Sequence, residues 1–199
     1  METKEYYSFL GQRLTYEQTL KIDKHMVIVK QDGVRKRFEL FTLGALHGIY
    51  YFRNLDEDIE LIKERYNRSS VCILTKMIEQ NGFTQYWSDS WNKDGSFLTS
   101  RIDVYDSDDR QIYWGIINED GISIEEVMKR KYRDSHKYLY IFFYNEDGTF
   151  KSAKIDSDID YEDGAFYPEN VGDPDLDFTW EGNEFYQHAE PKIPENIIV

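Results

Sequence analysis

The chain has 199 residues, enough for one domain with a sizeable core, and 16% of them are aromatic. It carries 38 acids against 24 bases, a net charge of −14. This excess of acid argues against binding to nucleic acid or to an anionic membrane surface, because both are negatively charged. A basic protein partner or a cation fits this charge better.

Cysteine content and hydropathy indicate the compartment. Cys72 is the single cysteine of the sequence, so an intramolecular disulfide is excluded and a reducing compartment is favoured. No run of about 18 apolar residues predicts a membrane span, and no apolar signal segment follows Met1. We therefore expect a cytoplasmic protein that does not cross a membrane.

Residues 1–82 are predicted to form a mixed half of helices and one hairpin. A partial apolar stripe predicts helix within 2–22. A compact apolar run at 25–30 is followed by an Asp-Gly turn and an alternating segment at 34–43, which together predict a β-hairpin. A further strand is expected at 49–53.

Two longer helices are predicted next, at 55–68 and 69–80. In the first, acids come early and bases late, an order that complements the helix dipole. In the second, Val71 and Leu74 lie on one side, and Asn81-Gly82 is a typical end of a helix.

From residue 83 the apolar pattern changes to period two, which is typical of strands. Asp-Gly turns recur between them and favour tight hairpins. A helix is expected at 123–133, where Ser and Glu stand at capping-box spacing. The strands are predicted at 83–91, 96–105, 110–118, 137–145 and 149–156.

The predicted fold class is thus α+β in a single domain, 1–199. It has N-terminal helices and a hairpin in 1–82 and an antiparallel meander at about 83–156. An acidic, aromatic, loop-rich segment follows at 157–199.

Most of the net charge lies in residues 156–190. This stretch holds twelve acids, seven aromatic residues and no Lys or Arg, whereas the rest of the chain has 26 acids and 24 bases. Its prolines and lack of periodicity predict extended loop, and its aromatic content predicts packing on the sheet rather than disorder. We expect it to lie outside the main sheet.

Acids and aromatics together favour an interface with a basic protein. Tyr and Trp supply buried anchors, and carboxylates steer the encounter and pair with Lys and Arg. The predicted partner-binding residues are Asp156, Asp158, Asp160, Tyr161, Glu162, Asp163, Tyr167, Asp173, Asp175, Asp177, Trp180, Glu181, Glu184 and Tyr186.

Calcium binding is the first alternative. Asp158, Asp160 and Glu162 stand at every second position, and Glu169 follows eleven residues after Asp158, the spacing of an EF-hand loop. Asp163 occupies the place of the bend glycine, and no amphipathic helix flanks the loop. A solvated acidic loop explains the pattern better.

Enzymatic sites have weaker support. Asp175 followed by Glu190-Pro191-Lys192 resembles the loose carboxylate-and-lysine pattern of restriction-like nucleases, but the pattern is short and the acidic surface would repel phosphates. The histidines share no metal-ligand spacing, and no phosphate-binding or nucleophile motif occurs. Short basic runs such as 129–131 are explained by a solvated face. We therefore expect no enzyme activity, metal or cofactor.

Two segments carry a resemblance to a class of proteins. YDSDDRQIYWGIINEDG and YIFFYNEDGTFKSAKI, in an acidic and tyrosine-rich chain, resemble the immunity proteins of bacterial polymorphic and contact-dependent toxins. The resemblance implies tight, stoichiometric inhibition of a co-encoded toxin and no catalysis. The leading hypothesis is therefore an immunity or inhibitor protein; a cation-binding module and an enzyme with an unrecognised site are the alternatives.

Overall fold

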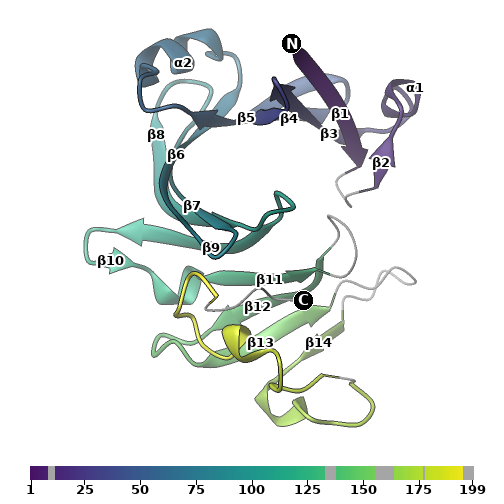
Figure 1. The fold of residues 1–199 in the computed structure, drawn as a ribbon, viewed down its shortest axis with the longest axis vertical. Coiled ribbons are helices and arrows are strands. Elements are labelled where there is room, and N and C mark those ends of the chain that lie inside the picture. The colour runs from purple at the N-terminus through teal and green to yellow at the C-terminus, as the bar shows by residue number, and fades with distance from the viewer. Residues whose placement is uncertain (9–11, 133–137, 156–163, 177, 195–199) are drawn as a thin grey trace. The chain divides into compact units, whose positions relative to one another are not determined.

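The computed structural model describes residues 1–8, 12–132, 138–155, 164–176 and 178–194. Within these residues the chain is mostly β-structure, with fourteen strands and two short α-helices, Tyr16–Thr19 (α1) and Ile59–Arg65 (α2) (Figure 1). The predicted α+β class, with helices in the N-terminal half, is therefore wrong.

The strands follow one another mainly as antiparallel neighbours. Three 3₁₀ turns accompany them: η1 (Ile124–Glu126), η2 (Pro168–Asn170) and η3 (Glu184–Tyr186). The strands are β1 (Glu2–Ser8), β2 (Arg13–Leu14), β3 (Lys24–Gln31), β4 (Val34–Thr42), β5 (Ala45–Arg53), β6 (Ser70–Gln80), β7 (Phe83–Trp91), β8 (Phe97–Tyr105), β9 (Gln111–Asn118), β10 (Gly121–Ile122), β11 (Met128–Tyr132), β12 (Tyr138–Tyr144), β13 (Phe150–Ile155) and β14 (Gly164–Phe166).

The chain divides into two compact units. The first comprises residues 1–76 and 86–100, and the second comprises 77–85 and 101–199. Strands β6, β7 and β8 each contribute residues to both. In the first unit the strand order is β2-β1-β3-β4-β5-β6-β7-β8. In the second, β9 is followed by β11, β12, β13 and β14, and β10 pairs with β9.

The first unit has its own core around one crossover. β5 and β6 are parallel, so the chain between them must cross over, and α2 lies in that connection. Asp58 caps α2 by accepting a hydrogen bond from the amide of Glu60. The buried cluster here comprises Ile49, Tyr51, Ile62, Val71 and Ile73.

The predicted helix at 69–80 is wrong, because this segment is strand β6. Residues 71–74 are all buried, so both faces of the strand are covered and the apolar run lacks a period. Asn81 and Gly82 have φ angles of 53° and 78° and form the tight turn of the β6–β7 hairpin. Asn-Gly is the strongest short hairpin signal, and here it is no helix end.

Three other helix predictions also need correction. Within 2–22 the described residues form β1, β2 and one short helix, α1, which Thr15 and Gln18 cap as a capping box. The helix predicted at 55–68 is shorter, 59–65. In place of a helix at 123–133, η1 leads into β11, whose backbone bonds are taken by β9 and β12.

The hairpin and the individual strand predictions are confirmed, whereas the predicted meander is interrupted by β11, which lies between β9 and β12. β3 and β4 pair across the turn predicted at residues 31–33. Strands β7, β8, β9, β12 and β13 lie where period two predicted them. The glycines of the recurring Asp-Gly turns, Gly95, Gly121 and Gly148, all have positive φ, which explains why glycine stands there.

Buried tyrosines predict a sharp response to alkali. Burial raises the pKa of Tyr113, Tyr144 and Tyr186 above the ordinary value of about 10. Their contribution to stability is complete below pH 10 and is lost above it, because only the unfolded chain then ionises them. Three such groups lower the free energy of unfolding by roughly 4 kcal/mol per pH unit above pH 10.

Spectroscopy checks this prediction. The part of the tyrosinate absorbance at 295 nm that comes from the buried tyrosines should rise in one cooperative step, together with the loss of near-ultraviolet circular dichroism. Non-cooperative titration of all tyrosines near pH 10, with the fold retained, would contradict it.

No helix in the described part of the chain is long and apolar enough to cross a membrane.

Candidate functional site

The acidic C-terminal segment is attached to the second unit at several points. Gly164–Phe166 forms β14, which pairs antiparallel with β13, with Phe166 opposite Ala153. Further on, Thr149 and His188 form an isolated β-bridge, and the amide of Ala189 donates to the carbonyl of Gly148 at 2.9 Å. The expectation that this segment lies outside the main sheet is therefore wrong for β14, which extends the sheet.

The aromatic residues of the segment form much of the core of the second unit. Phe166 and Phe178 are 2% and 3% exposed, and their ring centroids are 5.0 Å apart. Tyr186 stacks on Phe142 at 4.6 Å, and its carbonyl accepts a hydrogen bond of 3.0 Å from the Tyr144 hydroxyl. These rings hold the segment against the sheet from within.

Lys129 fixes the last part of the segment. Its side chain is fully buried, on β11, and its Nζ donates to the carbonyl oxygens of Phe185 (2.6 Å), His188 (2.7 Å) and Pro191 (2.8 Å). An ammonium group has three donors, so these three carbonyls use all of them. The Phe185 ring adds a cation–π contact at 3.9 Å.

Burial lowers the pKa of Lys129 to about 7, because water no longer solvates the ammonium charge. The three carbonyl acceptors and the nearby Glu190 carboxylate favour the charged form. The ammonium group of Lys129 connects β11 to η3 and to the residues after it. The carbonyls that it binds lie 56 to 62 positions later in the chain. The sequence interpretation of 129–131 as a solvated face is therefore wrong.

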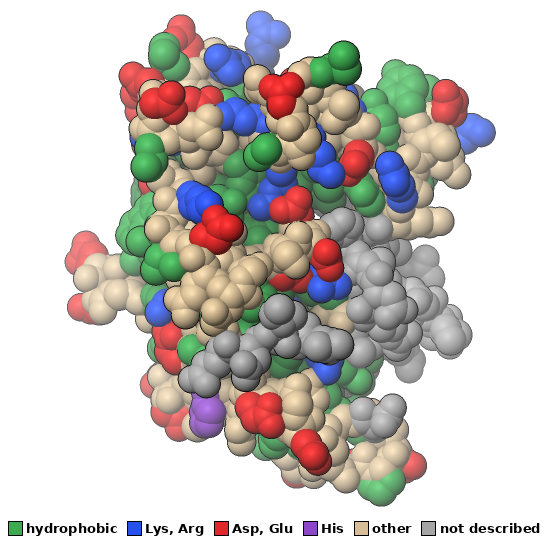
Figure 2. Space-filling model, viewed as in Figure 1, with side chains coloured by type: hydrophobic (Ala, Val, Ile, Leu, Met, Phe, Trp, Pro, Cys, Tyr) green, Lys and Arg blue, Asp and Glu red, His purple; other side chains and the backbone are tan. Residues whose placement is uncertain are grey.

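The described acids of the segment face solvent instead. We call the following six exposed side chains the acidic surface: Glu169, Asp173, Asp175, Glu181, Glu184 and Glu190. Several also shape the local backbone: Asp173 accepts from the amide of Asp175 at 3.0 Å, and Glu184 accepts from that of Gly182 at 3.0 Å. Backbone amide donors lower the pKa of Glu184. Acidic side chains on this part of the molecule are visible in Figure 2.

The predicted partner-binding residues divide into three groups. Tyr167 is 50% exposed, and Asp173, Asp175, Glu181 and Glu184 are exposed as well. Trp180 is half-buried against Phe150 and Phe178, and Tyr186 is 2% exposed and lies in the core. The others lie outside the described residues: Asp156, Asp158, Asp160, Tyr161, Glu162, Asp163 and Asp177.

The described residues give no support to the alternative calcium and nuclease sites. Most of the calcium loop lies outside the described residues, and the described part holds no cluster of His, Cys, Asp and Glu suited to a metal. Glu190 and Lys192 of the nuclease-like pattern form an exposed ion pair of 2.7 Å with each other. Cys72 is buried on β6, as expected of a small core residue.

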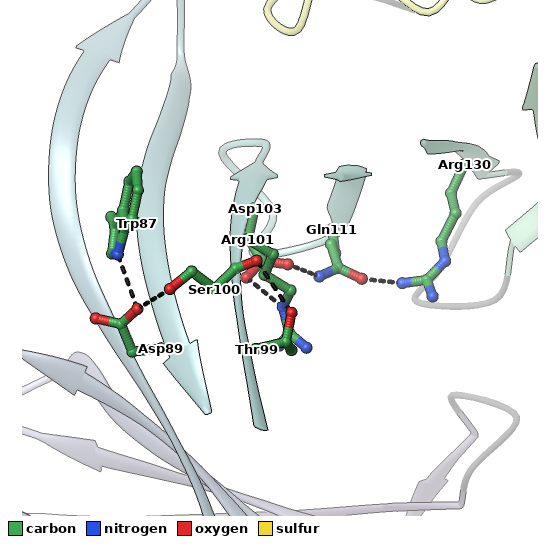
Figure 3. A network of polar contacts seen from close by, with 8 residues as sticks. All are labelled: Trp87, Asp89, Thr99, Ser100, Arg101, Asp103, Gln111 and Arg130. Atoms are coloured by element: carbon green, nitrogen blue, oxygen red, sulfur yellow. Dashed lines mark hydrogen bonds and ion pairs between the residues drawn. The ribbon is translucent and has the colours of Figure 1, made fainter. Parts of the chain in front are cut away.

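A separate polar row in the second unit supports its strands (Figure 3). Asp103 on β8 is completely buried and accepts from the Nε of Arg101 at 2.9 Å. It also accepts from the amide of Gln111, whose carbonyl accepts from Arg130 on β11. Because these groups pair with one another across neighbouring strands, the row is a structural network.

Sequence reasoning missed Lys129 because it assigned a helix to 123–133. On a strand, alternate residues point to opposite faces, so Lys129 shares a face with Lys131 and not with Arg130. The alternation of side chains along a strand was the signal available in the sequence. It can be used only when the segment is first recognised as a strand.

Comparisons of the chain with protein-family models, with curated proteins and with solved structures gave no match.

Proposed function

We propose that the chain is a non-catalytic immunity or inhibitor protein that binds a basic protein partner through the acidic surface. It acts in the cytoplasm and needs no cofactor. The observation that carries this proposal is the combination of exposed carboxylates with a firmly anchored backbone. Solubilising tails are also rich in charged residues, but their backbone is not anchored to a folded core.

The anchoring supports recognition because it reduces the cost of binding. Phe178 and Tyr186 pack within the core of the second unit, and Lys129 binds three carbonyls around η3. A surface that is ordered before binding loses less conformational entropy when the partner arrives. The carboxylates are thereby presented in a fixed arrangement to Lys and Arg of the partner.

Tyr167 supplies an aromatic contact beside these charges. It is 50% exposed and directly precedes η2, whose Glu169 belongs to the acidic surface. Tyrosine is enriched at binding hot spots because it combines a large apolar ring with a polar tip. Carboxylates that steer the encounter and a tyrosine that is buried in the complex are the arrangement expected for a tight inhibitor.

A growth assay tests the proposal. The products of the neighbouring genes are expressed in bacteria with this chain, which is expected to restore growth against a toxic product. The segment-neutral variant changes Asp173, Asp175, Glu181 and Glu184 to Asn or Gln and should lose protection at least about tenfold, since it removes four steering charges.

The control variant changes four exposed acids elsewhere, Asp56, Glu64, Glu119 and Glu146, to Asn or Gln. It alters the net charge equally and should keep full protection. Equal loss in both variants would show an effect of total charge, and full protection by the segment-neutral variant, or no toxic neighbouring product, would overturn the proposal.

A further inference from the structure

Asp-Gly steps are chemically sensitive points of a backbone, because glycine has no side chain to shield its amide nitrogen. That nitrogen can attack the carboxyl carbon of the preceding aspartate and close a succinimide ring. Five such steps occur in the sequence, at Asp32, Asp94, Asp120, Asp147 and Asp163, and the last of these aspartates lies outside the described residues. Whether a step reacts in the folded chain depends on what holds its carboxylate and its turn.

Three of the four described steps hold the carboxylate firmly. Oδ1 of Asp94 accepts from the hydroxyl of Ser96 at 2.6 Å and from its amide at 2.9 Å. Oδ1 of Asp147 accepts from the hydroxyl and amide of Thr149 at the same two distances. The hydroxyl, and after it the amide, lowers the pKa of each carboxyl, which disfavours the reactive protonated form. Asp32 pairs with the N-terminal ammonium group.

The turn at Asp120 is different. The residue two positions later is Ile122, which has no hydroxyl to donate. Asp120 is exposed, and no donor among the described residues contacts its carboxylate. Its own amide donates to Oδ1 of Asn118 at 3.1 Å, so the side chain of Asn118 holds the backbone of the turn and leaves the carboxylate unrestrained.

The strand after Asp120 is also held by few backbone bonds (Figure 1). β10 is two residues long and pairs with β9 at two positions, and one further bond, from the amide of Ser123 to the carbonyl of Ile116 at 2.9 Å, follows it. The turns at Asp94 and Asp147 join strands of six to nine residues. Local opening costs less where fewer bonds break, so the turn at Asp120 reaches the geometry for ring closure more easily.

We propose that Asp120 is a site of spontaneous isoaspartate formation in the folded protein, and that the turns at Asp94 and Asp147 are protected from it. The nitrogen of Gly121 bonds to Cγ of the protonated carboxyl group, whose OH leaves with the amide proton as water. A water molecule then opens the succinimide. Attack at the main-chain carbonyl routes the backbone through the side-chain carbonyl and frees the α-carboxylate, whereas attack at the other carbonyl restores aspartate.

The modification disturbs the hairpin locally. Isoaspartate adds one methylene group to the backbone of the turn, so β10 no longer keeps its register with β9. The residues of the acidic surface lie elsewhere in the sequence, at positions 169–190, so this site is independent of the proposed inhibitor function.

Peptide mapping after prolonged storage tests this site. The full chain is kept below its Tm in mildly acidic buffer, which supplies the protonated carboxyl group, and the isoaspartate in each Asp-Gly peptide is then measured by chromatography and mass spectrometry. Asp120 should convert at least about fivefold faster than Asp94 and Asp147, since fewer hydrogen bonds must break. Deamidation at Asn81-Gly82 changes the mass of its peptide, whereas isomerisation does not. Conversion at Asp120 no faster than at Asp94 and Asp147 would overturn the proposal.

Three variants separate protection by the hydroxyl from the Asp-Gly sequence alone. Thr149→Val removes the hydroxyl at Asp147 and should raise conversion there about fivefold, with Asp120 unchanged. Ile122→Thr places a hydroxyl at the matching position of the unprotected turn and should slow conversion at Asp120. Asp120→Glu disfavours ring closure and should leave this peptide unmodified. Unchanged conversion in either of the first two variants, or continued modification in the third, would contradict the assignment.

Discussion

Replacing Lys129 with methionine is expected to lower the free energy of unfolding of the second unit by about 3–5 kcal/mol. Methionine fills a similar volume, so the loss comes from the carbonyls of Phe185, His188 and Pro191, which remain buried without a donor. The amides around η3 should also exchange faster with deuterium, because the segment is no longer tied to β11. Urea unfolding and hydrogen exchange measure the two effects.

Lys131→Met is the matched control on the same strand. Lys131 is half-buried and donates to the side chain of Asn183, and no backbone carbonyl of the described residues accepts from it. We expect a loss of about 1 kcal/mol and a smaller rise in exchange around η3, because only one side-chain contact to the residue before η3 is lost. A loss below about 1 kcal/mol in Lys129→Met, with normal exchange, would show that the three carbonyl contacts do not hold the segment.

Asp103→Ala is expected to have a comparably large effect, a loss of about 3–5 kcal/mol. The carboxylate is completely buried, and its removal deprives Arg101, itself only 8% exposed, of this counter-ion. Gln111 also loses its acceptor in the row that links β8 and β9 to Arg130. Urea unfolding, followed by tryptophan fluorescence, to which Trp114 on β9 contributes, reports the change.

Asp108→Asn is the control for this prediction. Asp108 is exposed and contacts Arg110 at 3.5 Å, so its replacement should cost no more than about 0.5 kcal/mol. If Asp103→Ala and Asp108→Asn had similar small effects, the polar row would not be a structural network.

The sequence predicted best the elements whose signals are local. The β3–β4 hairpin and the strands after residue 83 follow from period two and from Asp-Gly turns, which act over a few residues. The acidic character of residues 156–190 could also be predicted from the sequence, because it depends on composition alone.

Elements that depend on distant pairing were not predictable in this way. The run at 71–74 is apolar at every position because β6 is covered on both faces, and such a run suits a buried helix equally well. Lys129 is buried and holds the C-terminal segment because backbone carbonyls some 60 residues later in the chain accept hydrogen bonds from its ammonium group. Likewise, the aromatic residues of the segment look like contact residues in sequence, but Phe178 and Tyr186 are core.

The association kinetics of the toxic product of the neighbouring gene with this chain test the central claim most directly. At about 20 mM salt, the segment-neutral variant should associate at least roughly tenfold more slowly than the wild type and the control variant. The difference should shrink at about 500 mM salt, where charges are screened beyond a few ångström. Equal association rates for the three proteins at low salt would contradict an acidic recognition surface at residues 169–190.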